Sequence, residues 1–195
     1  QIFKLINRMF FELGDAEASE LQFRGRTDIS PEEYLRLVRK KAADVEALTR
    51  ISAILGGGSE EEVEKLGEYG RLLGIILILR DDMWDTTDFA ETSHRIKKEC
   101  LPLPIIYALQ FKQTKSKLAS LILKQPITRR DIKEIQEIAI KFGGLKQSQR
   151  LINKFAEKAC RIVQPIEFNY NLKIFALTSC IPYLNKKTRV RSGFG

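Results

Sequence analysis

Histidine and cysteine are scarce in this chain of 195 residues, which has one histidine, His94, and three cysteines. The cysteines lie far apart and form no C-x-x-C pair; they are Cys100, Cys160 and Cys180. Their odd number and wide spacing argue against a disulfide framework and favour a reducing compartment, in which they serve as small buried hydrophobic residues. His94 lies in a polar stretch, and we interpret it as a surface residue rather than a base.

The sequence also lacks a long hydrophobic run. Its longest apolar stretch, residues 72–79, is too short to span a bilayer, and no basic segment followed by an apolar one opens the chain. We therefore expect a soluble, cytoplasmic protein with no transmembrane segment. The chain begins at Gln1 inside an amphipathic pattern, so we interpret it as a fragment or a processed product.

Basic residues exceed acidic ones, and the net charge of +8 favours anionic partners such as nucleic acid, a membrane surface or phosphorylated metabolites. A basic cluster near the end consists of Lys186, Lys187, Arg189 and Arg191. No helix-turn-helix, zinc-finger or stacking-aromatic pattern accompanies this cluster, so we expect no nucleic-acid binding. The cluster is either a frayed, solvated end or a tail that folds over an anion site.

An all-α fold is predicted, because helical periodicity dominates and no alternating pattern with hairpin turns competes with it. Capping signals mark two helix starts, Ser30 with Glu33 and Ser59 with Glu62. Residues 86–99 are expected to form a polar loop. The expected helices cover about 1–13, 16–24, 30–55, 59–85, 102–111, 115–124, 128–142, 147–160 and 166–184. No linker or repeat divides residues 1–195, which predicts a single domain.

The sequence Asp81-Asp82-Met83-Trp84-Asp85 is the most informative cluster of charge. Asp81 and Asp85 are four residues apart and share one face of a helix, where like charges repel unless a cation lies between them. Carboxylate oxygens suit magnesium, with Asp82 supporting the ion through water. A solvated helix end is the alternative interpretation, but the apolar run at 72–79 favours a helix that carries these carboxylates into an interior cavity.

Four blocks of the sequence, in order, resemble the trans-type isoprenyl diphosphate synthases. Residues 74–85 resemble that family's second aspartate-rich region, and residues 34–43 resemble its helix ending in a lysine-threonine pair. Glu20-Leu21-Gln22 resembles its glycine-glutamine signature, and residues 98–102 resemble its lysine-x-threonine-leucine-proline segment. Four ordered blocks are far more specific than any one of them.

The resemblance implies a helical bundle of the isoprenoid synthase type, of which residues 1–195 form the C-terminal portion without the N-terminal helices. It implies a magnesium-dependent prenyltransferase that condenses an allylic diphosphate with isopentenyl diphosphate. By motif match, the metal ligands are Asp81, Asp82 and Asp85, the catalytic residues are Lys41 and Lys98, and the substrate-binding residues are Gln22, Lys41 and Lys98. Relatives are commonly dimers, which implies a homodimer or a complex with a chain that supplies the first aspartate-rich motif.

Several positions depart from the family's pattern. Leu77-Ile78 replaces phenylalanine-glutamine, Leu21 replaces glycine, Ala42 replaces threonine and Cys100 replaces threonine. The first aspartate-rich motif, expected upstream of Gln1, is absent from the sequence. Three interpretations therefore stay open. The chain is part of an active synthase, or it is a non-catalytic or regulatory subunit of a synthase. The third interpretation is an unrelated helical module that binds anions. The retained D-D-x-x-D pattern favours chain elongation over terpene cyclisation, and product length is not set by the residues present.

Overall fold

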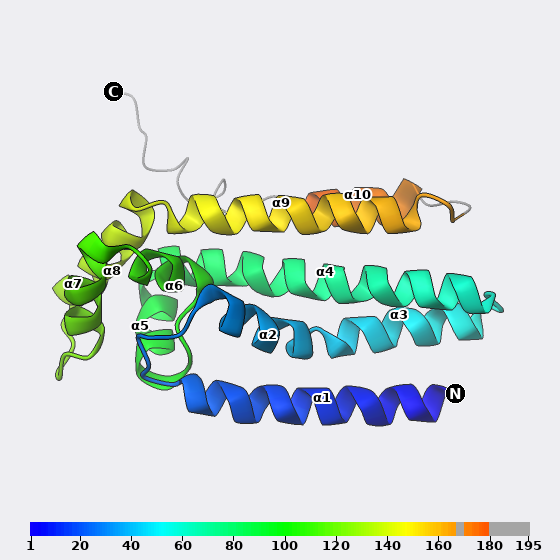
Figure 1. The fold of residues 1–195 in the computed structure, drawn as a ribbon, viewed down its shortest axis with the longest axis horizontal. Helices are drawn as coiled ribbons and strands as arrows, with labels where there is room; N and C mark the ends of the chain where they lie inside the picture. The colour runs from blue at the N-terminus through cyan, green and yellow to red at the C-terminus, as the bar shows by residue number, and fades with distance from the viewer. Residues whose placement is uncertain (167–169, 180–195) are drawn as a thin grey trace.

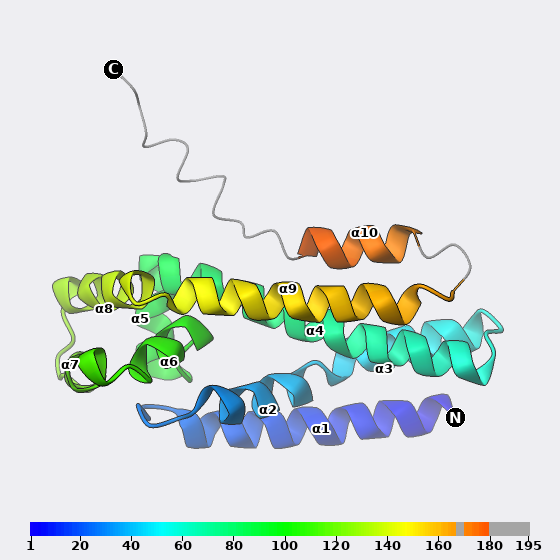
Figure 2. The same cartoon turned by 45° about the horizontal axis from the view of Figure 1, so that its top comes forward.

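The computed structural model describes residues 1–166 and 170–179, and every regular element within these ranges is an α-helix, which confirms the all-α prediction. The helices are α1 (Ile2–Phe23), α2 (Pro31–Lys41), α3 (Ala43–Leu55), α4 (Glu60–Thr87), α5 (Phe89–Lys98), α6 (Leu103–Leu109), α7 (Lys112–Ile122), α8 (Arg129–Lys141), α9 (Gly144–Val163) and α10 (Tyr170–Ser179). Figures 1 and 2 show α1, α3, α4 and α9 running along the long axis, whereas α5 to α8 gather at one end.

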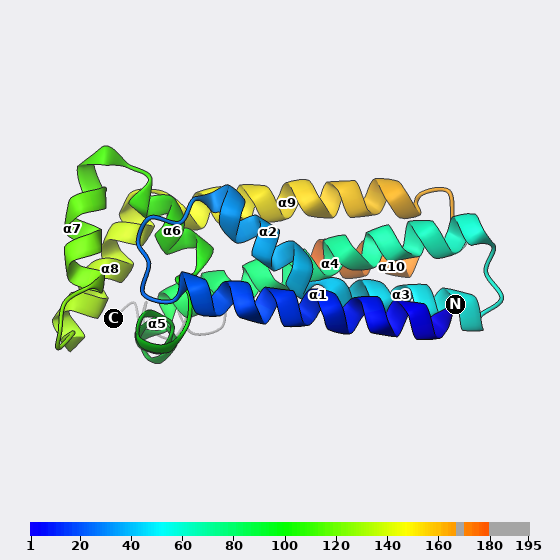
Figure 3. The same cartoon turned by 60° about the horizontal axis from the view of Figure 1, so that its bottom comes forward.

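Helix α4 is the central element, because it packs against α2, α3, α5, α6, α8, α9 and α10. Its middle is buried from Tyr69 to Ile76, as the apolar run predicts, and burial resumes at Leu79, Asp82 and Met83. Figure 3 shows that α4 runs toward the end of the molecule where α5 lies. The aspartate-rich segment therefore reaches a region enclosed by α2, α5 and α6.

Two glycines of α4 allow α3 to approach it closely. A Cβ atom on Gly70 would lie 2.7 Å from the Val45 carbonyl oxygen, and a Cβ atom on Gly74 would lie 2.8 Å from the Ala42 Cβ. Contacts this short do not occur between real Cβ atoms and their neighbours, so larger residues would push the helices apart. This close packing fixes the position of α4 along its axis relative to α2 and α3, and therefore the position of the aspartates.

Helix α1 is continuous, and the predicted break at residues 14–15 is wrong. Gly14 lies on the exposed side of the helix with no atom within 4 Å of its Cβ position. A glycine inside a helix costs only about 1 kcal/mol relative to alanine. The packing of α1 on α2 and α3 outweighs this cost.

The single helix expected over residues 30–55 is divided at Ala42, which was not predicted. Ala42 is fully buried with ψ of 9°, outside the helical range, and it ends α2 and precedes α3. Alanine is the strongest helix former, so the sequence carries no local signal of this break. The bend arises from tertiary contact, since the Ala42 Cβ faces Gly74 of α4.

The loop expected over residues 86–99 is instead mostly helix α5, so that prediction is wrong. The Asp88 carboxylate caps the helix by accepting hydrogen bonds from the backbone N–H groups of Ala90 and Glu91, at 2.8 and 3.2 Å. An aspartate cap satisfies N–H groups that otherwise lack a partner, so a short polar helix is stable here. His94 therefore lies on a helix, with its side chain 55% exposed, as expected of a surface residue.

The C-terminal part of the last expected helix, the basic cluster at residues 186–191 and Cys180 lie outside the described residues. Of the other two cysteines, Cys100 is buried and Cys160 is half-buried. In the part of the chain that the structure describes, no helix has both the length and the apolar character needed to cross a bilayer.

Candidate active site

Asp82 is the most deeply buried group of the aspartate-rich segment, with 1% of the residue exposed. Its carboxylate accepts a hydrogen bond from the Tyr34 hydroxyl, whose oxygen lies 2.7 and 2.9 Å from the two carboxylate oxygens, and one from the Leu103 backbone N–H at 3.1 Å. Arg95 donates a further bond to Asp82 Oδ1 at 3.1 Å. Burial raises the pKa of Asp82, while Arg95 and these hydrogen bonds act in the opposite direction. Asp82 thus joins α2, α4, α5 and α6 and has no side facing solvent.

Arg95 of α5 connects the two inner aspartates of the segment. Its Nη2 binds Asp82 and its Nη1 lies 3.1 Å from Asp85 Oδ2. Its Nε donates to the Cys100 carbonyl oxygen at 2.9 Å, and Glu99 lies 3.4 Å away. Burial acts to lower the pKa of Arg95, but the adjacent Asp82 charge and other contacts raise it overall, so the guanidinium stays charged.

Asp81 and Asp85, which were expected to share one helix face, differ strongly in exposure. The Asp85 side chain is 16% exposed and the Asp81 side chain 67% exposed. Asp81 lies 3.6 Å from Arg80, whereas Asp85 is held by Arg95. Burial raises the pKa of Asp85 to about 6, an effect that Arg95 opposes and the nearby Asp82 charge increases. Asp85 is therefore a carboxylate with raised proton affinity at the edge of the protein interior.

These carboxylates fit a divalent ion only in part. Within residues 1–166 and 170–179, no three histidine, cysteine, aspartate or glutamate side chains converge as a metal cluster. Asp82 does not fit, because three donor groups of the protein, on Tyr34, Arg95 and Leu103, already occupy its oxygens. Asp81 and Asp85 supply two hard oxygen ligands one helical turn apart, which suits magnesium when phosphate oxygens and water complete its shell.

A cleft of about 280 Å³ brings together the two lysines predicted as site residues. Lys41 is the last residue of α2 and Lys98 the last of α5. The cleft is lined by Glu17, Glu20, Leu21, Arg24, Lys41, Lys98 and Glu99. Three cationic and three anionic side chains line it, so the charges of the lining residues balance.

Glu20 is the residue that binds Lys41, through a close ion pair with the lysine ammonium group. Burial acts to raise the pKa of Glu20, but Lys41 and a hydrogen bond from Cys100 more than offset it, so this pKa is lowered. Gln22, the expected cavity residue of the same helix, is exposed and does not line the cleft. Gln22 lies two residues from Glu20 on α1, and residues two apart on a helix do not share a face.

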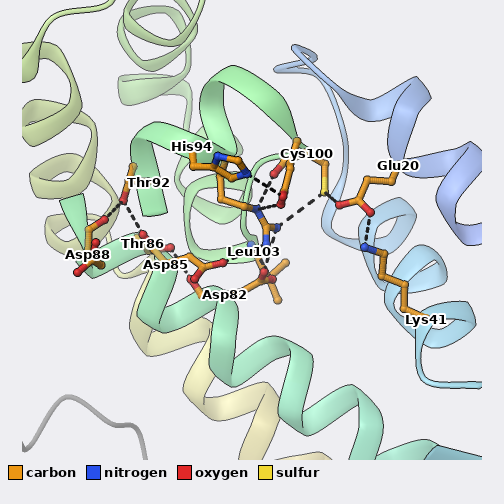
Figure 4. A network of polar contacts seen from close by, with 12 residues as sticks. Glu20, Lys41, Asp82, Asp85, Thr86, Asp88, Thr92, His94, Cys100 and Leu103 are labelled. Carbon is orange, nitrogen blue, oxygen red and sulfur yellow. Dashed lines mark hydrogen bonds and ion pairs between the residues drawn. The ribbon is translucent and has the colours of Figure 1, made fainter. Parts of the chain in front are cut away.

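A chain of contacts links the lysine cleft to the aspartates (Figure 4). The Cys100 thiol donates to Glu20 Oε1 at 3.3 Å, and Arg95 Nη2 lies 3.8 Å from the same sulfur. Burial raises the pKa of the Cys100 thiol to about 12, so the sulfur remains a neutral donor. Cys100 therefore lies between one group that binds Lys41 and one that binds Asp82 and Asp85.

Arg95, Glu20 and Tyr34 were not singled out as site residues from the sequence. Tyr34 was read only as the start of the lysine-containing block, and Glu20 as the neighbour of Gln22. Asp88 is a helix-capping signal in the sequence, and it could have been used to predict α5. Arg95 would then lie one turn before Lys98 on the same helix. Nothing in the sequence indicates that Arg95 points toward the aspartates.

Comparison with known proteins places the chain in a family. Residues 1–139 match the model of the polyprenyl synthetase family, and the chain belongs to that family. It is 37% identical over 79 residues to a short chain isoprenyl diphosphate synthase of Methanothermobacter thermautotrophicus, a match covering 40% of this chain and 24% of that protein. It is 33% identical over 94 residues to a geranylgeranyl diphosphate synthase of Methanosarcina mazei, covering 48% of this chain and 29% of the relative.

The fold is likewise shared with solved structures. A polyprenyl synthase from Caulobacter crescentus, crystallised with calcium and isoprenyl diphosphate, superposes with a TM-score of 0.82 at 21% identity. That match covers 92% of this chain and 58% of the Caulobacter chain. The chain thus shares most of its own length, and little more than half of theirs, with such structures.

Proposed function

We propose that the chain is the C-terminal portion of a trans-type isoprenyl diphosphate synthase, which joins an allylic diphosphate to isopentenyl diphosphate. The observation that carries the proposal is the meeting of Lys41 and Lys98 in one cleft beside the aspartate-rich segment. These residues come from separate helices and belong to separate sequence blocks. Chance similarity of the blocks would not bring them together.

The two lysines suit a diphosphate ligand. Each ammonium group carries a compact positive charge with three donors, and together they can compensate the charge that develops on a departing diphosphate. Arg24 at the rim of the cleft adds a further cation. Under the proposal, Lys41 and Lys98 bind and orient the diphosphate, and Leu21 contributes an apolar part of the wall.

Magnesium is part of the proposal, with Asp81 and Asp85 as its protein ligands. When bound, the ion would polarise the diphosphate leaving group. Asp82 holds α4, α5 and α6 in place beneath them rather than binding the ion. A polyprenyl synthase of the same fold from Caulobacter was crystallised with calcium and isoprenyl diphosphate, which supports a divalent cation as part of the proposal.

The proposal requires a first aspartate-rich motif, which the 195 residues do not contain. Another segment or chain would supply it, and α1 offers a surface for such a partner. Phe3, Phe10 and Phe11 project from α1 with 74%, 65% and 79% exposed, and their spacing places them on one face of the helix. A homodimer formed through this face is the other possible arrangement.

The cytoplasm is the compartment we propose, on the basis of free cysteines at positions 100 and 160. Relatives named as chloroplastic and mitochondrial enzymes show that family members occupy several compartments. Fractionation of cells that express the tagged protein tests this part of the proposal.

A non-catalytic or regulatory subunit of a synthase is the second candidate function. The internal pairing of Lys41 with Glu20 and of Asp85 with Arg95 favours it, because both groups are already neutralised. Under this candidate, the chain binds a partner synthase and changes its output without itself contributing to the chemical step.

A turnover assay separates the two candidates. The protein, purified with any chain that assembles with it, is incubated with magnesium, isopentenyl diphosphate and allylic diphosphates while diphosphate release is followed. The synthase proposal predicts metal-dependent release that falls at least about a hundredfold in Asp81→Ala/Asp85→Ala. Release that is unchanged in this variant, with an active partner present, supports the regulatory candidate and contradicts the synthase proposal.

A further inference from the structure

Two of the groups proposed to bind a ligand, Lys41 and Asp85, are already paired with an oppositely charged side chain of the protein. Lys41 is paired with Glu20, whose side chain is 14% exposed, and Asp85 is paired with Arg95, whose side chain is 13% exposed. Neither Glu20 nor Arg95 is part of the proposed ligand shell. Both are held in place by other contacts, so these pairs are ordered features of the interior and not loose surface contacts.

We infer that Glu20 and Arg95 are internal counter-ions, which occupy Lys41 and Asp85 until diphosphate and a divalent ion displace them. This inference rests on the proposed function and adds to it two positioning residues that control ligand entry. Glu20 stands in for the anionic diphosphate, and Arg95 stands in for the cation. Diphosphate must displace Glu20 from Lys41, and the cation must displace Arg95 from Asp85. Each displacement costs the free energy of the ion pair that is broken.

The geometry allows the displaced groups to neutralise each other. Glu20 Oε1 and Arg95 Nη2 lie 3.3 and 3.8 Å from the same atom, the Cys100 sulfur. Because both charges contact one sulfur, we infer that Glu20, once released by Lys41, can rotate toward the Arg95 guanidinium. Release of both therefore leaves a carboxylate and a guanidinium beside each other, and not two isolated charges in the interior.

Asp82 keeps Arg95 from leaving its place altogether. The Nη2 group of Arg95 is bound to Asp82 and Tyr34, at 3.1 and 3.2 Å, while its Nη1 group binds Asp85. Displacement by a metal ion therefore concerns the Nη1 contact alone. Arg95 remains anchored by Asp82 and changes only which second carboxylate it binds, Asp85 or Glu20.

Exchange of this kind makes the two ligands depend on each other. A metal ion alone releases Arg95 while Glu20 is still occupied by Lys41, and diphosphate alone releases Glu20 while Arg95 is still held by Asp85. Only when both ligands bind are both counter-ions free to pair. Either ligand alone is thus expected to bind weakly, and loss of one counter-ion is expected to strengthen binding of its own ligand.

Binding measurements on the protein, purified with any chain that assembles with it, test the inference without turnover. Trp84 lies within the aspartate-rich segment and is the single tryptophan of the sequence, so its fluorescence reports local metal binding. Manganese alone is titrated by this signal and by electron paramagnetic resonance. Inorganic diphosphate alone, without metal, is titrated by calorimetry. The test variants are Glu20→Gln and Arg95→Lys, which retains the positive charge that Asp82 needs.

A matched control lies on the same helix as each test position. Asp15→Asn removes a carboxylate of the same helix that is paired with Lys40 and does not line the cleft. Lys97→Gln removes an exposed cation from α5 that contacts neither Asp82 nor Asp85. Lysine is shorter than arginine and has no planar fork, so Arg95→Lys is expected to keep its contact with Asp82 and to lose the one with Asp85.

The inference predicts that Glu20→Gln binds diphosphate about tenfold more tightly, and that Arg95→Lys binds manganese about tenfold more tightly, than the wild type. The controls change either affinity less than about twofold. Equal affinities in the wild type and the test variants overturn the counter-ion inference and leave the proposed function standing. Failure of every variant to bind either ligand contradicts both.

Discussion

Tyr34 and Asp82 are far apart in the sequence, yet the Tyr34 hydroxyl oxygen lies 2.7 and 2.9 Å from the two carboxylate oxygens of Asp82. Both residues are buried, with 2% and 1% exposed. This contact fixes α2 against α4. It also supports Arg95, whose Nη2 group donates to the same hydroxyl at 3.2 Å.

Tyr34→Phe is expected to lower the free energy of unfolding by about 1 to 3 kcal/mol, because it removes a donor from a buried carboxylate without changing shape. Tyr107→Phe is a suitable control, since the Tyr107 hydroxyl makes no hydrogen bond to another described residue and the tyrosine is only half-buried. Chemical denaturation of the two variants measures the difference. Equal stabilities would show that the hydroxyl is not needed by Asp82.

Gly70→Ala is expected to destabilise the protein by about 1 to 3 kcal/mol, because the new methyl group would overlap Thr49 and the Val45 carbonyl oxygen. Gly14→Ala is the matched substitution in open space and is expected to stabilise α1 by up to about 1 kcal/mol. Thermal denaturation of both variants measures whether each substitution raises or lowers the stability. A stabilising Gly70→Ala would contradict the close approach of α3 and α4.

Asp131 provides a pH-dependent contribution to the stability of α8. Hydrogen bonds from Lys124 and Thr128 lower its pKa from 3.8 to about 2. A carboxylate whose pKa is lower in the folded state stabilises the protein above its unfolded pKa, and this contribution disappears as pH falls through the folded pKa. The stability difference between wild type and Asp131→Asn is therefore expected to be full at neutral pH and to shrink between about pH 4 and pH 2.

Denaturant titrations at several pH values measure this difference. Asp131 also completes the capping box of α8, in which its side chain accepts a bond from the Thr128 backbone N–H at 2.8 Å. A difference that stays constant down to pH 2 would show that the Lys124 and Thr128 contacts do not depend on the carboxylate charge.

The apolar face of α1 is expected to mediate assembly. Phe10→Glu/Phe11→Glu places two charges where aromatic rings are exposed in the chain alone, so it should weaken any dimer or complex at least about tenfold without unfolding the helix. Light scattering coupled to size-exclusion chromatography measures the change in mass. An unchanged assembly would mean that the partner binds elsewhere.

Much of the fold follows from local chemistry that the sequence displays. The capping boxes at Ser30 and Ser59 begin α2 and α4 as predicted, and the apolar run before the aspartates is buried on α4. Errors occur where packing overrides local preference. Gly14 does not break α1 and Ala42 does divide a helix, because tertiary contacts decide both positions.

The candidate site is only partly predictable for a related reason. Sequence blocks indicate Lys41, Lys98 and the aspartates, and the structure brings the two lysines into one cleft. The sequence blocks do not indicate which neighbouring side chains neutralise the charges of these lysines and aspartates. Glu20 and Arg95 become visible only when α1, α4 and α5 are placed together, since their partners are distant in the sequence.

The central claim is that Lys41 and Lys98 bind one diphosphate, and calorimetric titration of magnesium diphosphate tests it most directly. Lys41→Gln and Lys98→Gln are each predicted to weaken binding about tenfold or more, and the double variant to show a non-additive loss, while Lys97→Gln binds as the wild type does. Unchanged affinity in the double variant would contradict the claim that this cleft is the diphosphate site.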